Sequence, residues 1–216
     1  MNVLYVYAHP DDPRSLNAAL RAEAERMLAS MGHTVNDSDL YRMDFRPVLD
    51  ERDFPDRAVA ERFIVNVEIR RSLSNAKVPA DVAVELEKLR DADLVIFQFP
   101  LWWSSVPAIL KGWFDRVLSF GFAADTGGAA RQPFLRGKKA LIVTTLEAPE
   151  ENHPTESQSG IRELLVPISV NTLSYAGMTV LPTFIVYDAT PEKPPEWVAS
   201  QVERLKAHLV LVLTGL

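Results

Sequence analysis

Short runs of apolar residues, each of strand length, alternate along this chain with segments of helical periodicity. The clearest runs are 2–7 (NVLYVY), 93–99 (DLVIFQF) and 138–145 (KKALIVTT). Each contains a stretch of consecutive apolar residues, which is typical of strands that are buried on both faces, as in a parallel sheet. Strands that alternate with helices in this way predict parallel βαβ units with right-handed crossovers.

Weaker signals complete the expected order of elements. Two further strands are expected at 33–40 and at 178–187, the second interrupted by Pro182. Helices are expected from about Ser15 to Gly32, over 83–89, over 108–118, over 161–175 with Pro167 kinking or dividing it, and over 196–213. The charged stretch 41–79 is expected to be a long connection with a helix inside it, and 120–133 and 146–160 are expected to be loops.

The length and one missing motif select the sheet arrangement. A chain of 216 residues suits one α/β domain, so we expect a single domain over residues 1–216. No Gly-x-Gly-x-x-Gly follows the first strand, which removes the Rossmann fingerprint. The common five-strand arrangement that remains is flavodoxin-like. It is a three-layer sandwich whose parallel sheet has the strand order 2-1-3-4-5, with helices on both faces.

Composition excludes several classes of function. The formal charge is -6 and no basic stripe is present, so nucleic acid is not the expected partner. The chain has no cysteine, so any electron chemistry needs a cofactor, and no metal site is predicted. We identify no signal peptide and no stretch of the ~20 apolar residues that a membrane span needs. The expected location is the cytoplasm, without membrane insertion.

The fold predicts where a ligand binds. In open parallel sheets, ligands bind outside the carboxyl ends of the strands, where the winding reverses. That rule selects the three loops 9–17, 100–106 and 144–147.

The first loop leads into a helix, whose first backbone N–H groups can hold an anion. Side chains of His9, Ser15 and Asn17 could add hydrogen bonds to a phosphate. For Ser15 the alternative, that it only caps the helix, is preferred.

The second loop carries Trp102 and Trp103, which are well placed to pack on a flat heteroaromatic ring. Core packing or a subunit contact is the alternative for either tryptophan. In the third loop, the hydroxyls of Thr144 and Thr145 could meet the far edge of the same ring. Together the three loops indicate a planar, phosphorylated ligand.

The string FQFPLWWSSVPAILKGWFDRVL at 97–118 strongly resembles the signature region of the NAD(P)H:quinone oxidoreductase family, which contains DT-diaphorase and bacterial relatives. Further segments resemble the family in the same order, namely YVYAHPDDPRSLNAAL at 5–20, LYRMDFRPVL at 40–49, PFLRGKKALIVTT at 133–145 and the helix at 167–177.

The resemblance implies a flavin, usually FAD, held non-covalently by a dimeric flavodoxin-like protein. NAD(P)H would donate a hydride and a quinone would accept two electrons in the same pocket, in ping-pong fashion, with no catalytic side chain assigned. By motif position, His9, Leu16 and Asn17 would contact the diphosphate and ribityl chain, together with Ser15. The ring would be contacted by Pro100, Leu101, Trp102, Trp103, Thr144, Thr145, Leu146 and Glu147.

Three departures concern the ring and the substrate side of the pocket. Leu146 and Glu147 stand where the family commonly has two glycines. Residues 122–126 (FAADT) replace two pocket tyrosines. The histidine of the family's proposed proton relay has no clear match in this chain. Gln158 is nearest to it by position, and His153 lies close by in the sequence. The substrate pocket is expected to include Trp103, Gln158 and Tyr175, the last because it falls near a pocket aromatic of the family. Core packing is the alternative for Tyr175.

Two alternatives to a quinone reductase remain. Some bacterial relatives are ancillary subunits of potassium-efflux systems, so a flavin-binding regulatory subunit with little quinone turnover is one alternative. A flavodoxin-type electron carrier is the other, which the extra length of this chain disfavours. A homodimer is expected on family grounds and from the apolar surplus at 108–122 and 209–216. The sequence leaves open FAD against FMN, NADPH against NADH, and the acceptor.

Overall fold

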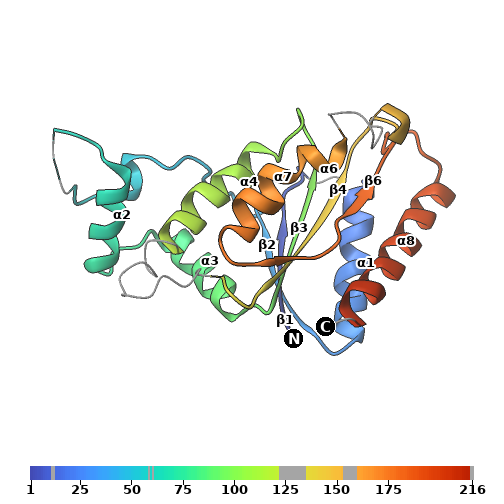
Figure 1. The fold of residues 1–216 in the computed structure, drawn as a ribbon, viewed down its shortest axis with the longest axis horizontal. Helices are drawn as coiled ribbons and strands as arrows, with labels where there is room; N and C mark the ends of the chain where they lie inside the picture. The colour runs from blue at the N-terminus through green and yellow to red at the C-terminus, as the bar shows by residue number, and fades with distance from the viewer. Residues whose placement is uncertain (11–12, 58, 60, 122–134, 153–159, 215–216) are drawn as a thin grey trace.

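Parallel strands lie at the centre of the computed structural model, which describes residues 1–10, 13–57, 59, 61–121, 135–152 and 160–214 (Figure 1). The strands are β1 (Asn2–Tyr7), β2 (Thr34–Asp39), β3 (Leu94–Pro100), β4 (Lys139–Thr145), β5 (Thr179–Val180) and β6 (Phe184–Val186). Their order is β2-β1-β3-β4-β5, and β6 also pairs with β4. All of these pairings are parallel, so the predicted flavodoxin-like arrangement is confirmed.

Helices cover both faces of this sheet (Figure 1). On one face, α1 (Leu16–Ser30) packs beside α8 (Pro195–Thr214). The remaining helices are α2 (Val65–Ser74), α3 (Ala80–Asp91), α4 (Ala108–Trp113), α6 (Ile161–Leu164) and α7 (Val166–Ile168). Short 3-10 helices lie at η1 (Glu51–Asp53) and η3 (Glu150–Asn152), and π-helical turns at η2 (Phe114–Leu118) and η4 (Ser169–Ser174).

The sheet separates two apolar cores. Along β1, Tyr5 and Tyr7 belong to the core under α1 and α8, whereas Leu4 and Val6 belong to the core under α3 and α4. This division follows from the strand geometry, in which successive side chains point to opposite faces. Both faces of β1 are therefore buried, as its continuous apolar sequence predicts.

Prolines divide two of the expected elements. The expected strand 178–187 is split into β5 and β6 around Pro182, and both parts pair with β4. Pro167 lies in the first turn of α7 and separates it from α6, so the expected helix 161–175 is divided. Pro lacks the N–H group that continuous elements need.

The expected helix 108–118 continues through residue 121, so the first two residues of the expected loop 120–133 are helical and that expectation is wrong for them. The other described residue ranges agree with the expected elements to within a few residues at each end. The rest of that loop, the segment 122–126, and the predicted residues Gln158 and His153 lie outside the described residues.

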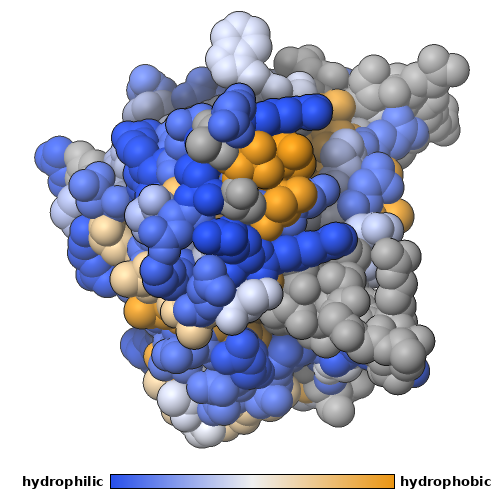
Figure 2. All heavy atoms as spheres, turned by 90° about the vertical axis from the view of Figure 1, so that its left-hand side faces the viewer, coloured by the Kyte–Doolittle hydropathy of each residue, from blue (hydrophilic) through white to orange (hydrophobic). Residues whose placement is uncertain are grey.

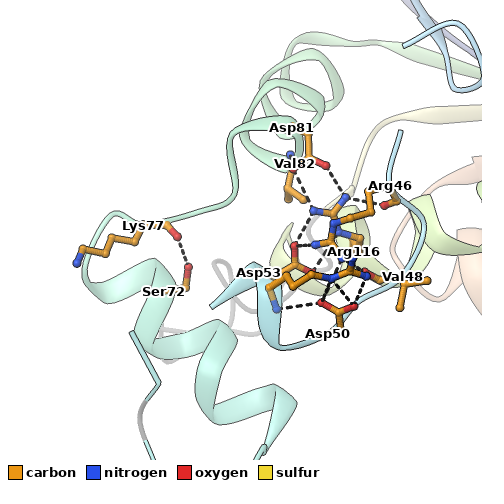
Figure 3. A network of polar contacts seen from close by, with 10 residues as sticks. Arg46, Val48, Asp50, Asp53, Ser72, Lys77, Asp81, Val82 and Arg116 are labelled. Carbon is orange, nitrogen blue, oxygen red and sulfur yellow. Dashed lines mark hydrogen bonds and ion pairs between the residues drawn. The ribbon is translucent and has the colours of Figure 1, made fainter. Parts of the chain in front are cut away.

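A buried ionic network attaches the long connection between β2 and α3 to the helices beside it (Figure 3). The Arg116 side chain is 1% exposed and lies 2.7 Å from Asp53 Oδ1. The same guanidinium donates to Asp81 Oδ1 at 3.0 Å and to the carbonyl of Arg46 at 2.7 Å. Arg46 in turn pairs with Asp53 and Asp50. One guanidinium thus joins η1, the segment before it and α3.

This network makes the protein sensitive to acid. Burial alone would raise the pKa of the Asp81 carboxyl, but hydrogen bonds and charge from Arg116 outweigh it, so the pKa is below its ordinary value. A carboxyl with a lowered pKa in the folded state contributes stability above its ordinary pKa of about 4, and that contribution is lost as the pH falls further. We therefore expect Asp81→Asn to lose less stability than the unmodified chain between pH 6 and pH 3. Urea midpoints at the two pH values measure this difference, and equal losses would contradict it.

The end of the molecule that carries α2 presents a mainly hydrophilic surface, with apolar areas between the polar side chains (Figure 2). Exposed apolar side chains in this part of the chain include Val48 and Val67. None of the helices over the described ranges is both long and apolar enough to cross a membrane.

Candidate functional site

A cavity lies at the carboxyl ends of β1, β3 and β4, where the three predicted loops meet. Its volume is about 980 Å³, at the upper end of the range usual for small-molecule sites. Of the residues predicted to bind the cofactor, it is lined by His9, Ser15, Leu16, Asn17, Pro100, Leu101, Trp102, Trp103, Thr145, Leu146 and Glu147. Thr144 is the predicted residue that does not line it.

The amino-terminal end of α1 forms one wall of the cavity. Ser15 Oγ accepts a hydrogen bond from the N–H of Ala18 at 3.1 Å. Ser15 therefore caps the helix, which is the role that the sequence analysis preferred for it. The next two residues, Leu16 and Asn17, begin the helix and line the cavity. Backbone N–H groups at such positions have no partner within the helix and can bind an anion.

Trp103 projects from a strained tight turn at the mouth of the cavity. Trp102 and Ser105 exchange two backbone hydrogen bonds of 3.0 Å. Between them, Trp103 and Ser104 have φ angles of 50° and 59°. Such left-handed conformations cost about 1–2 kcal/mol for residues other than glycine. Trp103 is fully exposed and Trp102 is 42% exposed, so core packing does not account for either ring. Backbone strain of this kind is concentrated at binding sites.

Relief of this strain is testable. Ser104→Gly is expected to raise the free energy of unfolding by about 1 kcal/mol, because glycine adopts a positive φ without steric cost. The neighbouring Ser105→Gly is the matched control. Ser105 is not among the described residues with a positive φ, so glycine there adds only flexibility and should destabilise. Thermal or urea unfolding measures both variants, and a Ser104→Gly protein no more stable than the Ser105→Gly protein would contradict the expectation.

Of the two adjacent threonines, only Thr145 reaches the cavity. Successive side chains of a strand point to opposite faces, and Thr145 faces α1 while Thr144 faces the other core. Thr144 is fully buried, and its hydroxyl has no hydrogen-bond partner in the part of the chain that the structure describes. The sequence pattern did not separate the two because both follow the same apolar run.

Asn17 and Thr145 are joined through the protein interior. Asn17 Nδ2 donates to Thr145 Oγ1 at 2.9 Å, and the side chain of Gln98 on β3 donates to Asn17. Gln98 was missed as a residue of the site. Its signal in the sequence is a polar amide within an otherwise apolar, buried strand.

The departure at Leu146 and Glu147 has a simple structural basis. Neither is among the described non-glycine residues with a positive φ, so the backbone here does not require glycine. The Leu146 N–H donates to Val186 and its carbonyl accepts from Ala189, at 3.0 and 2.9 Å. The loop after β4 is thereby held to the loop after β6. Glu147 is exposed at the cavity wall.

The loop after β6 and the start of α8 supply residues that the sequence reasoning missed. Lys193 and Trp197 line the cavity, with the Lys193 ammonium 5.3 Å from the centre of the Trp197 ring. Lys193 also pairs with Asp188. Arg14 adds a further cation beside α1. Applying the strand-end rule to the last strand as well would have selected this loop.

One of the residues predicted for the substrate pocket, Tyr175, lies away from this cavity. Tyr175 lines a separate cavity of about 320 Å³ with residues of α4, η2 and α7, and is 71% exposed. Gln158 lies outside the described residues. Of the two that the structure describes, Trp103 lines the cavity described above.

Comparisons with known proteins agree with this fold. A family model described as flavodoxin-like fold matches residues 1–209. The chain is 39% identical over 210 residues to ribosyldihydronicotinamide dehydrogenase [quinone] of Mus musculus, a match that covers 95% of this chain and 90% of the relative. It is 35% identical over 211 residues to NAD(P)H dehydrogenase [quinone] 1 of Rattus norvegicus, over 97% of this chain and 76% of the relative. A crystal structure from Klebsiella pneumoniae, described as that of a candidate quinone reductase, superposes with a TM-score of 0.88 at 37% identity. That match covers 98% of this chain and 85% of the other.

Proposed function

Because this chain belongs to the flavodoxin-like fold family, with quinone dehydrogenases among its relatives, we propose that it is a flavin-dependent NAD(P)H:quinone oxidoreductase. The reaction is a two-electron transfer from a reduced nicotinamide to a quinone or similar acceptor. None of the relatives named above is an ion-efflux subunit, so the comparisons give that alternative no support.

The mixed lining of the cavity carries this proposal. The amino-terminal end of α1 and the cations Arg14 and Lys193 suit phosphate groups. Trp103 on its tight turn and the Thr145 hydroxyl suit a flat ring with polar edges. FAD has both parts, and so does the smaller FMN. Since the cavity volume of about 980 Å³ suits the larger of the two, FAD is the proposed cofactor.

The residues of the chain bind and orient, and the flavin supplies the redox chemistry when bound. Backbone N–H groups of α1 hold the phosphates, with His9 nearby. Trp103 covers the ring and excludes water from one side of it. The proposed reaction needs no nucleophilic side chain, so the protein contributes by positioning both substrates in turn at one place.

The cofactor is tested by releasing it with heat from the purified protein and identifying it chromatographically. FAD is the expected result, and FMN would correct the identity of the flavin without changing the reaction. A protein that is purified without flavin and binds neither FAD nor FMN would overturn the proposal.

The activity is tested with NADH, NADPH and N-ribosyldihydronicotinamide as donors, the last because it is named for one of the relatives. With a simple quinone as acceptor, parallel lines in double-reciprocal plots are expected, since donor and acceptor use one pocket in turn. A yellow protein whose flavin is not bleached by any of the three donors would contradict the reaction.

The proposed active form is a homodimer. Leu211 and Val210 near the end of α8 are 71% and 45% exposed. Apolar residues beside the smaller cavity are exposed as well, such as Val170 at 52%. Light scattering of the flavin-bound protein should give twice the chain mass of 24.2 kDa. A single chain mass would exclude a pocket shared between subunits.

A further inference from the structure

Gln98 places an amide at the centre of the sheet. Its side chain is fully buried on β3, where a polar group is costly unless its hydrogen bonds are made. Both ends are satisfied, because the Tyr5 hydroxyl donates to Gln98 Oε1 and Gln98 Nε2 donates to the Asn17 carbonyl at 2.7 Å. Gln98 Nε2 also lies 3.2 Å from Asn17 Oδ1.

The backbone carbonyl of Asn17 determines which way the Gln98 amide points. A carbonyl oxygen can only accept, so the Gln98 atom that faces it must be the nitrogen. The oxygen then faces Tyr5, which must donate. Burial raises the pKa of Tyr5 well above its ordinary value, so its hydroxyl keeps the proton that this bond requires.

The same logic extends to Thr145. Because Gln98 Nε2 faces Asn17 Oδ1, the amide nitrogen of Asn17 is the atom that faces Thr145 Oγ1, at 2.9 Å. Thr145 Oγ1 therefore accepts this bond and keeps its own O–H to donate. Among the described residues, no acceptor for that O–H is found. Thr145 lines the cavity, so its proton is available to a ligand.

We propose that Gln98 is a positioning residue which, through Asn17, holds Thr145 as a hydrogen-bond donor to the edge of the ligand's ring. This rests on the proposed function in that the ligand is a flavin. The group recognised is an acceptor on a flat heteroaromatic ring, either a carbonyl oxygen or an unprotonated ring nitrogen. Neither Gln98 nor Tyr5 touches the cavity.

Loss of Gln98 has a specific consequence for Thr145. Without the donor on β3, the Asn17 carboxamide is free to turn over and present its oxygen to Thr145. The hydroxyl then donates to Asn17 and no longer to the ligand. A change at Gln98 should therefore remove the same ligand contact as a change at Thr145 itself.

A double-mutant cycle on the full chain, freed of flavin, tests this coupling by quenching of flavin fluorescence. Gln98→Met and Thr145→Val are each expected to weaken binding roughly fivefold to tenfold, the effect of one hydrogen bond. The double variant is expected to bind no more weakly than the weaker single variant, because both changes remove one contact. The same fold-change is expected with riboflavin, FMN and FAD, since the contact is to the ring. The proposal would be overturned if the double variant lost affinity by the product of the two single losses. It would also be overturned if either single variant bound flavin as tightly as the unmodified chain.

Matched controls separate positioning from general damage. Thr144→Val changes the adjacent, unpartnered threonine and should leave affinity unchanged. Thr145→Ser keeps the hydroxyl and should retain most of the affinity. Tyr5→Phe should lower stability in urea but leave the affinity near that of the unmodified chain, because Gln98 still donates to Asn17. A Tyr5→Phe loss equal to that of Gln98→Met would reduce Gln98 to a structural role and contradict the proposal.

Two further outcomes are distinguishable. If Gln98→Met does not fold, Gln98→Asn, which keeps an amide but is one methylene shorter, serves in the same cycle with the same expectation. If the unmodified chain binds none of the three flavins, the proposed function fails. If it binds them and the affinity losses of the two single variants multiply in the double variant, only the role of Gln98 fails.

Discussion

Replacing Arg116 with methionine is expected to lower the free energy of unfolding by about 3–5 kcal/mol, the cost typical of removing one partner from a buried ion pair. The Asp53 side chain is 1% exposed and would lose its two contacts with this guanidinium, keeping its pair with Arg46. The backbone carbonyl of Arg46 would lose a donor as well. Asp81 is partly exposed and would regain water, so Asp53 dominates the loss.

Arg52→Met is the matched control, because Arg52 forms an exposed pair with Asp50 on the same segment. Exposed pairs of this kind contribute little, so its urea midpoint should stay close to that of the unmodified chain. Arg116→Lys should fall between the two, since an ammonium keeps the charge but cannot bridge two carboxylates and a carbonyl at once. If Arg116→Met were as stable as Arg52→Met, the network would not hold the connection in place. Flavin affinity should change little in variants that remain folded, because the network does not line the cavity.

Gly112→Ala is expected to destabilise the protein by about 3 kcal/mol, at the upper end of the usual cost of overpacking. A Cβ atom at Gly112 would lie 2.2 Å from the carbonyl oxygen of Pro47 and 2.3 Å from its Cα. The neighbour is backbone, so no flexible side chain can move aside. Alanine is otherwise favoured over glycine inside a helix by about 1 kcal/mol, so a loss here would have to be steric.

Gly32→Ala provides a control of a different kind. Gly32 has a φ of +80°, and nothing lies within 4 Å of the position of an added Cβ. Its substitution should cost about 1–2 kcal/mol, from backbone conformation alone. Urea unfolding of both variants compares steric with conformational cost. A Gly112→Ala protein as stable as the unmodified chain would show that α4 and the segment at Pro47 are not in close contact.

The order of elements and the sheet topology followed from local patterns. The apolar runs at 2–7, 93–99 and 138–145 match β1, β3 and β4 closely, because a strand buried on both faces needs apolar residues at consecutive positions. The position of the site followed from topology alone, through the rule that ligands bind at the carboxyl ends of strands. Neither inference needed a side-chain contact.

Individual side chains within the site could be assigned only in part. Thr144 and Thr145 are equivalent by sequence pattern, but the pleat turns one away from the cavity. Tyr175 was expected in the substrate pocket by resemblance, and the structure places it at a different cavity. Lys193 and Trp197 were missed because they reach the cavity from the loop after β6 and the start of α8, far along the chain from the motifs.

The sequence by itself determined the kind of fold and the edge of the sheet at which a ligand would bind, because periodicity and strand order are local properties of the chain. Only the tertiary structure decided which groups meet at that edge. The direction of the hydrogen bonds from Tyr5 through Gln98 and Asn17 to Thr145 depends on strand register across β1, β3 and β4. The pairing of Arg116 with Asp53 depends on a contact between residues 63 positions apart. Such contacts are made by packing, which brings distant residues together whatever their spacing in the sequence.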